Sequence, residues 1–109
     1  PSGAGADGFA FVIQNDGRKA VGTQVGGIGY GIPRSLAVEF DTYRNPEHGE
    51  LNGNHISVHV PSRVGRRNNA NHKENSIAYS ENIPDLQEGT HVARIVYQTK
   101  HYTWDDRAP

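Results

Sequence analysis

In two segments of the sequence, residues 36–43 and 55–60, large apolar side chains recur at every second position. Successive side chains of a strand point to opposite faces of a sheet, so this period indicates strands with one apolar face. No stretch repeats apolar residues at the 3.6-residue period of a helix, and glycine-rich turns separate the segments. The pattern predicts an all-β chain, an antiparallel β-sandwich, with six apolar side chains in its core: Phe9, Phe11, Val38, Phe40, Ile56 and Val58.

Further strands are predicted at residues 9–13, 77–79 and 92–97, where short apolar runs are bounded by turn residues. A tight turn is expected at residues 15–17, which read Asn-Asp-Gly. The charged, asparagine-rich stretch 63–75 is interpreted as an exposed connection. At most one helical turn is expected in the whole chain.

Length and charge narrow the functional classes. The 109 residues are enough for one small domain. The formal net charge is −1, from 11 basic and 12 acidic side chains, so no overall field favours nucleic acid or an anionic membrane. The basic stretch around Arg66 and Arg67 lacks interleaved aromatic residues and is interpreted as a solvated loop. No apolar run reaches the roughly 20 residues that span a bilayer, so membrane insertion is not expected.

The polar face of residues 36–43 carries candidate metal ligands. Glu39, Asp41 and Tyr43 lie on one side of the predicted strand. A polar loop with Glu50 then leads to the next strand, which begins at His55. If the loop folds back, the carboxylates and the imidazole converge. Oxygen ligands in this number suit Ca²⁺, and one imidazole beside carboxylates suits a transition ion such as Mn²⁺. The alternative is a solvated strand face without a metal.

Three ordered motifs resemble those of the L-type (legume-type) lectin domains. The stretch LAVEFDTY at residues 36–43 is similar to the metal-binding strand of that family, and the spacing to the later ligand positions also matches. Upstream, ADGFAF at residues 6–11 resembles the segment with the sugar-binding Asp. GGIGY at residues 26–30 resembles the glycine-rich sugar loop. The resemblance covers residues 5–60 and is closest to bacterial and microbial members.

The resemblance implies a concanavalin A-like jelly roll and carbohydrate binding without catalysis. It implies Ca²⁺ and a transition-metal ion, Mn²⁺ by analogy, as cofactors. It also implies glycans as ligands and an extracellular or cell-surface location, and it is compatible with an oligomer. The metal ligands would be Glu39, Asp41, Tyr43 (through its carbonyl), Asn45, Glu50 and His55. The carbohydrate-binding residues would be Asp7, Gly26, Gly27, Tyr43 and Asn45.

Two departures from the family pattern keep alternatives open. The family has Asp where this chain has Glu50, and its domain is longer, so residues 1–109 are expected to form a partial, truncated domain. A structural or adhesive module that keeps the sandwich but has lost sugar binding is one alternative. A glycoside hydrolase on a related sandwich is another, although Tyr43 stands where the strand would need its second catalytic Glu.

Overall fold

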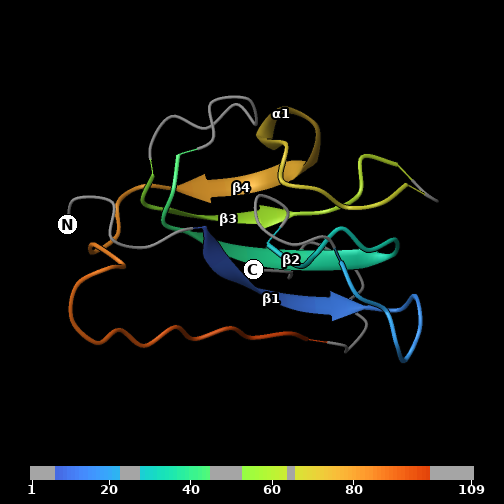
Figure 1. The fold of residues 1–109 in the computed structure, drawn as a ribbon, viewed down its shortest axis with the longest axis horizontal. Helices are drawn as coiled ribbons and strands as arrows, with labels where there is room; N and C mark the ends of the chain where they lie inside the picture. The colour runs from blue at the N-terminus through green and yellow to red at the C-terminus, as the bar shows by residue number, and fades with distance from the viewer. Residues whose placement is uncertain (1–6, 23–27, 45–52, 64–65, 99–109) are drawn as a thin grey trace, which may run out of the picture.

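The computed structural model describes residues 7–22, 28–44, 53–63 and 66–98. These residues form one four-stranded antiparallel sheet in which the strands lie side by side in chain order, as Figure 1 shows. The strands are β1 (Gly8–Gln14), β2 (Ser35–Asp41), β3 (His55–His59) and β4 (Ser76–Ser80). This antiparallel, strand-dominated arrangement confirms the all-β prediction.

One four-residue helix, α1 (His72–Asn75), immediately precedes β4. The predicted strand at residues 92–97 is wrong, because residues 91–98 carry no strand assignment and pair with no strand of the described sheet. Val92 is 94% exposed, and without a neighbouring ladder an apolar run lacks the backbone hydrogen bonds that define a strand. In the parts of the chain that the structure describes, no helix has the length and apolar character needed to cross a membrane.

The register of the sheet decides which side chains share a face. Asp41 pairs with Gly8 on one side and with His55 on the other. Two residues earlier on β2, Glu39 pairs with Ser57. Directly paired residues point to the same side of a sheet, and so do residues two apart on one strand. Glu39, Asp41 and His55 therefore belong to one face, which we call the inner face.

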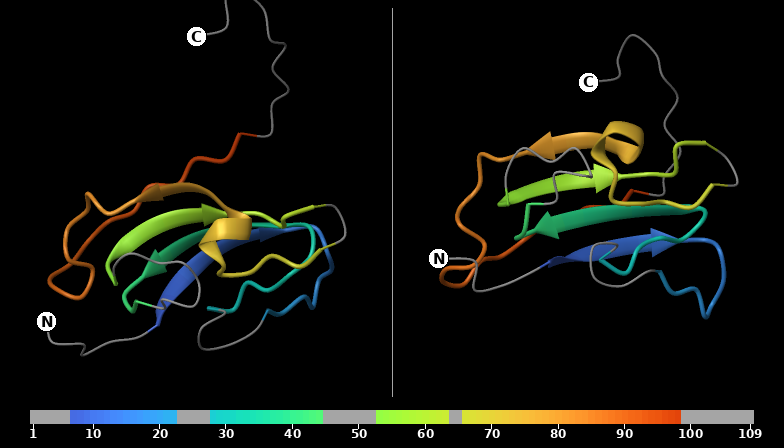
Figure 2. Two further views of the ribbon diagram at one scale, coloured as in Figure 1. Left: turned by 90° about the horizontal axis from the view of Figure 1, so that it is seen from above. Right: turned by 45° about the horizontal axis from the view of Figure 1, so that its top comes forward.

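The inner face is the buried side of the sheet. All its side chains from β2 and β3 are buried, and six of them are at most 1% exposed: Ala37, Glu39, Asp41, His55, Ser57 and His59. Tyr30, Ala37 and Ala70 form an apolar cluster beside them, and Ala10 and Val12 of β1 pack against it. In Figure 2, α1 and the segments next to it lie beneath the concave side of the curved sheet. The polar strand face is thus covered rather than solvated.

The opposite, outer face carries the six apolar residues predicted for the core. Phe40 is buried, whereas Val38, Ile56 and Val58 are half-buried. The prediction is wrong for Phe9, 61% exposed, and Phe11, 45% exposed. Phe9 stacks on Phe40 with ring centroids 4.7 Å apart, so its exposed ring still has a partner. A cleft of ≈ 340 Å³ lies on the outer face, between Phe9 and Phe40 of the sheet and the later residues Ile83 and Leu86.

Residues 66–75, here called the covering segment, are fastened to the sheet by asparagine side chains. Asn68 donates its amide to the carbonyl of His59 at 2.9 Å, and Asn75 donates to the carbonyl of Val60 at 2.7 Å. Asn71 caps α1 by accepting from the backbone N–H groups of Lys73 and Glu74. Three side chains of this segment are buried, so the prediction of an exposed connection is wrong there: Asn68, Ala70 and Asn75.

Candidate metal centre on the inner face

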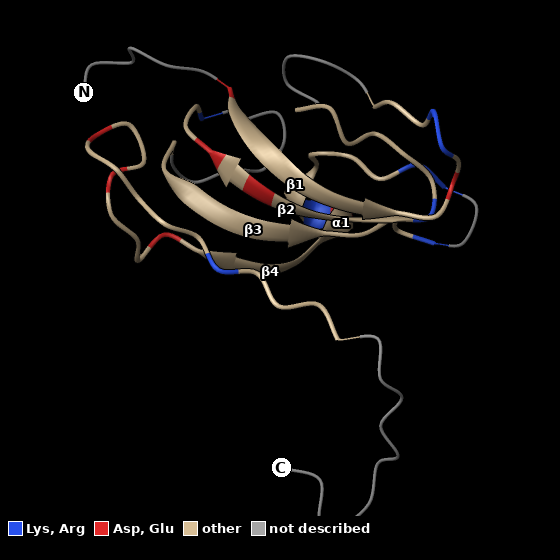
Figure 3. Cartoon of the chain, turned by 90° about the horizontal axis from the view of Figure 1, so that it is seen from below, with Lys and Arg blue, Asp and Glu red and all other residues tan. Residues whose placement is uncertain are grey.

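Glu39, Asp41 and His55 meet at the centre of the inner face. His55 Nε2 lies 3.2 Å from Glu39 Oε1 and 3.8 Å from Asp41 Oδ2. All three side chains are almost fully buried. Figure 3 shows the acidic positions of β2, in red, on the half of the strand that carries the arrowhead. Three of the predicted ligands are therefore brought together by strand pairing alone.

Glu39 is also surrounded by groups that sequence reasoning did not assign to the site. Tyr30 donates its O–H to Glu39 Oε2 at 2.6 Å. His72 of α1 places Nε2 3.4 Å from Glu39 Oε1, and His59 Nε2 lies 3.8 Å from the same oxygen. The position of His59 could have been read from the sequence, because an even spacing from His55 puts both on one strand face. No periodic signal pointed to Tyr30 or His72.

The protonation of Glu39 follows from these neighbours. Burial raises the pKa of this carboxyl, because a charge in a low-dielectric interior loses its hydration. The contacts with His55 and His72, the hydrogen bond from Tyr30 and the nearby imidazole of His59 outweigh that effect and hold the pKa of Glu39 well below its usual range. Glu39 is therefore a buried carboxylate anion, which is stable only while cations or hydrogen-bond donors surround it.

His59 is held as a neutral imidazole. Its Nδ1 lies 2.9 Å from the carbonyl oxygen of Asn69, so Nδ1 carries the proton and donates it. Its Nε2 lies 2.9 Å from the hydroxyl oxygen of Ser57, which also donates to Glu39 Oε1 at 3.3 Å. Burial lowers the pKa of His59, and the attraction of Glu39 only partly opposes that shift. His59 consequently supports the arrangement around Glu39 without needing a charge of its own.

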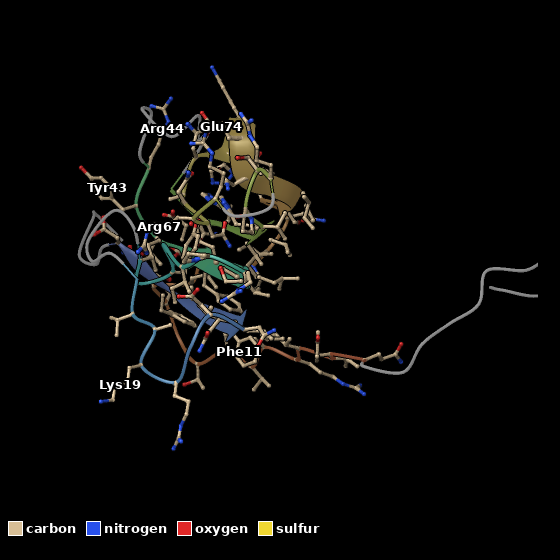
Figure 4. All side chains as sticks on the ribbon, turned by 90° about the vertical axis from the view of Figure 1, so that its right-hand side faces the viewer. Phe11, Lys19, Tyr43, Arg44, Arg67 and Glu74 are labelled. Carbon is tan, nitrogen blue, oxygen red and sulfur yellow. The ribbon has the colours of Figure 1, made fainter. Side chains whose placement is uncertain are left out.

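Asp7 and Tyr43 lie at the end of β2 that carries Asp41. The carbonyl of Asp7 accepts from the backbone N–H of Thr42 at 3.1 Å, and the N–H of Tyr43 donates to Asp41 Oδ1 at 2.8 Å. Gly8, which follows Asp7, must be glycine, because its φ is +127° and a Cβ would lie 2.1 Å from the carbonyl oxygen of Phe40. In Figure 4, Tyr43 projects away from the body of the molecule, and its side chain is half exposed.

Four predicted site residues lie outside the described residues: Gly26, Gly27, Asn45 and Glu50. The described glycines beside these segments lie close to other backbone atoms. A Cβ on Gly53 would lie 2.9 Å from the backbone nitrogen of Arg44, and a Cβ on Gly22 would lie 2.2 Å from the carbonyl oxygen of Gly29. Both positions therefore leave little room for a side chain.

The donor set of the inner face fits a divalent cation. Glu39, His55 and His72 each offer one ligand atom, and these atoms lie within 4.8 Å of one another. A carboxylate and neutral imidazoles are ordinary ligands of transition ions. Asp41 adds a second carboxylate beside His55. Because Glu39 has no exposed surface, its carboxylate can hold a cation or a proton but cannot reach a large substrate.

The antiparallel sheet places the chain in the all-β class. The family model of the legume lectin domain matches residues 1–105. The chain therefore belongs to the legume lectin domain family, whose fold is the concanavalin A-like β-sandwich and whose membership implies carbohydrate binding.

One relative is the "L-type lectin-domain containing receptor kinase S.6" of Arabidopsis thaliana, which is 41% identical over 64 residues. The match covers 57% of this chain and 9% of that protein, so the chain spans a small part of the relative. No solved structure matches the chain.

Proposed function

We propose that this chain is a carbohydrate-binding domain whose glycan site depends on bound divalent cations and which catalyses no reaction. The observation that carries the proposal is the convergence of Glu39, Asp41 and His55 on one buried face, in a member of the legume lectin domain family. Asp7, the candidate sugar-binding residue, lies beside the end of β2 that carries Asp41, because its carbonyl accepts from the N–H of Thr42. This proximity of the candidate cation ligand Asp41 and the candidate sugar ligand Asp7 supports the proposal.

The cations would be held by Glu39, Asp41 and His55, with Asn45, Glu50 and the carbonyl of Tyr43 completing the sites. Ca²⁺ takes six to eight oxygen ligands and suits the carboxylate, amide and carbonyl oxygens. A transition ion, Mn²⁺ in the family pattern, suits the position beside the imidazole. A bound cation supplies fixed positive charge. Asn45 and Tyr43 would keep one orientation toward the sugar only while their oxygens are bound to the cation.

The sugar would be recognised by hydrogen bonds and by one apolar contact. The Asp7 carboxylate would accept from two adjacent hydroxyls, a charge-assisted pairing stronger than a neutral one. Asn45 would donate its amide, and backbone N–H groups at Gly26 and Gly27 would approach closely because no side chain intervenes. The half-exposed ring of Tyr43 is available to stack on a sugar face.

The location and partners follow from the same proposal. A receptor displays its binding domain outside the cell, and the Arabidopsis relative is by its description a receptor kinase with an L-type lectin domain. We therefore place this chain in the extracellular space or at a cell surface, as a partial domain spanning residues 1–109 that binds glycans.

The experiment is a glycan array with the complete parent domain, run in Ca²⁺ and Mn²⁺ and again in EDTA. We expect one class of glycan to bind with cations and to be lost in EDTA, while circular dichroism shows that the sheet persists. Binding that is equal in both buffers would contradict cation dependence. No binding to any glycan in either buffer would favour the structural module instead.

A further inference from the structure

Glu39 Oε1 is the point on which two imidazoles converge. His55 Nε2 lies 3.2 Å from this oxygen and His72 Nε2 lies 3.4 Å from it. Ligand atoms bonded at ~2.0–2.1 Å to one tetrahedral ion are separated by about 3.4 Å, the edge of the tetrahedron. The distances from Glu39 Oε1 to the two imidazole nitrogens are therefore close to those between ligands of a small divalent ion, and all three ligand atoms lie within 4.8 Å of one another.

His72 is held in this position from several sides. It opens α1, whose first turn is capped by the Asn71 side chain. Its ring makes edge-on contacts with His55 at 4.9 Å, with His59 at 4.7 Å and with Tyr79 at 5.5 Å between centroids. The side chain is 9% exposed. A ring fixed by packing loses little rotamer freedom when it binds an ion, so the site is preorganised.

The second imidazole changes which ion the site prefers. Carboxylates with a single imidazole suit Mn²⁺, whereas a second imidazole beside Glu39 moves the donor set toward the nitrogen-rich sites typical of Zn²⁺. Zn²⁺ also stands above Mn²⁺ in the general order of affinity for nitrogen ligands. His72 comes from the covering segment, outside the strands that carry Glu39 and His55.

We propose that His72 is a ligand of the transition ion on the inner face, together with Glu39 and His55, and that it makes this site select Zn²⁺ over Mn²⁺. The inference rests on the proposed function only in placing a cation at Glu39 and His55. It requires neither that the chain bind sugar nor that Ca²⁺ be present.

The first test is X-ray absorption at the zinc edge of the wild-type chain loaded with one equivalent of Zn²⁺. Multiple scattering from imidazole rings counts those that are bound, and we expect two. One imidazole, none, or no Zn²⁺ retained on the chain would overturn the proposal. This measurement does not depend on whether any variant folds.

The second test compares metal affinities of His72→Phe, which keeps an aromatic ring in the packed position, with those of wild type. Competition against a chelating dye should show Zn²⁺ binding weakened by at least about tenfold and Mn²⁺ binding changed by less than about threefold. Lys73→Ala, at the exposed neighbouring position of α1, is the control and should leave both affinities unchanged. Equal losses for both ions, or none, would contradict a role for His72 in selecting Zn²⁺.

These outcomes separate this inference from the proposed function. A two-imidazole zinc site in a chain that binds no glycan would sustain the inference and defeat the lectin proposal. Glycan binding that disappears in EDTA, together with a single imidazole bound to Zn²⁺, would support the lectin proposal and overturn the role of His72.

Discussion

Tyr30 donates its phenolic O–H to Oε2 of Glu39 across 2.6 Å, and neither side chain has exposed surface. The two residues come from different parts of the chain. Tyr30 lies in the loop before β2, and Glu39 lies in the middle of that strand. The bond ties the loop to the sheet and stabilises the anionic form of a carboxylate that burial alone would destabilise. Several consequences for stability and binding can be measured.

Tyr30→Phe removes this donor while keeping the ring. A hydrogen bond to a charged group contributes about 1.5–3 kcal/mol, so the free energy of unfolding should fall by about that amount. The pKa of Glu39 should rise toward its usual range at the same time. Urea unfolding measures the first effect. Tyr43→Phe is the matched control, because the Tyr43 side chain is half exposed, and it should change stability by less than about 0.5 kcal/mol.

The free energy of unfolding should fall as pH is lowered, because the pKa values of His59 and Glu39 are both lowered in the folded chain. The pKa of His59 is lowered from 6.5 in the folded chain, so below pH 6.5 the unfolded chain takes up a proton that the folded chain does not. The pKa of Glu39 is lowered from 4.5, which adds a second loss below pH 4.5. Urea midpoints in EDTA from pH 8 to pH 3 should show the first loss below pH 6.5 and the start of the second below pH 4.5. A midpoint that rises on acidification would contradict the assignment.

Gly8→Ala tests the backbone that positions Asp7. The residue has φ of +127°, and the new Cβ would lie 2.1 Å from the Phe40 carbonyl oxygen, so β1 must shift. We expect a loss of about 1–3 kcal/mol in stability and weaker glycan binding. Gly17→Ala is the control, since a Cβ there meets nothing within 4 Å. If the two variants melt at the same temperature, the close approach of β1 and β2 at Gly8 does not exist.

Asp7→Ala in the complete parent domain should weaken glycan binding by at least about tenfold, because charge-assisted hydrogen bonds contribute about 1.5–3 kcal/mol each. Asp7→Asn should also bind poorly, since it loses the charge and one acceptor. Calorimetry with the glycan found on the array gives the affinities. Asp16→Ala, which removes only an exposed contact with Arg34, should bind as wild type does. Undiminished affinity of Asp7→Ala would place the sugar site elsewhere.

Much of the sheet was predictable because period-two alternation is a local signal. The pattern in residues 36–43 and 55–60 correctly placed Glu39, Asp41 and His55 on one face. What failed was the choice of the buried face. A strand face with two acids and two histidines looks solvated in the sequence, yet the covering segment buries it. That burial depends on long-range contacts, such as those from Asn68 and Asn75, which no period reveals.

The residues around Glu39 divide into those on paired strands, whose positions follow from local spacing, and those that come from loops. Glu39, Asp41 and His55, which lie on paired strands, could be placed from spacing. Tyr30 and His72 reach Glu39 from loops, so their approach depends on loop conformation rather than on strand geometry. The polar character of residues 63–75 suggested solvent exposure, but their asparagines instead satisfy buried backbone carbonyls. Sequence polarity alone cannot separate these two uses of an amide side chain.

The sealed inner face also affects how fast ions exchange. Glu39 and His55 have no exposed surface, so we expect an ion held there to leave when the covering segment, which carries His72, detaches from the sheet. The rate of release is then the rate of that local opening, whatever the chelator concentration outside. We expect the metal content of a purified sample to record the ions available while the chain folded, rather than those in the final buffer.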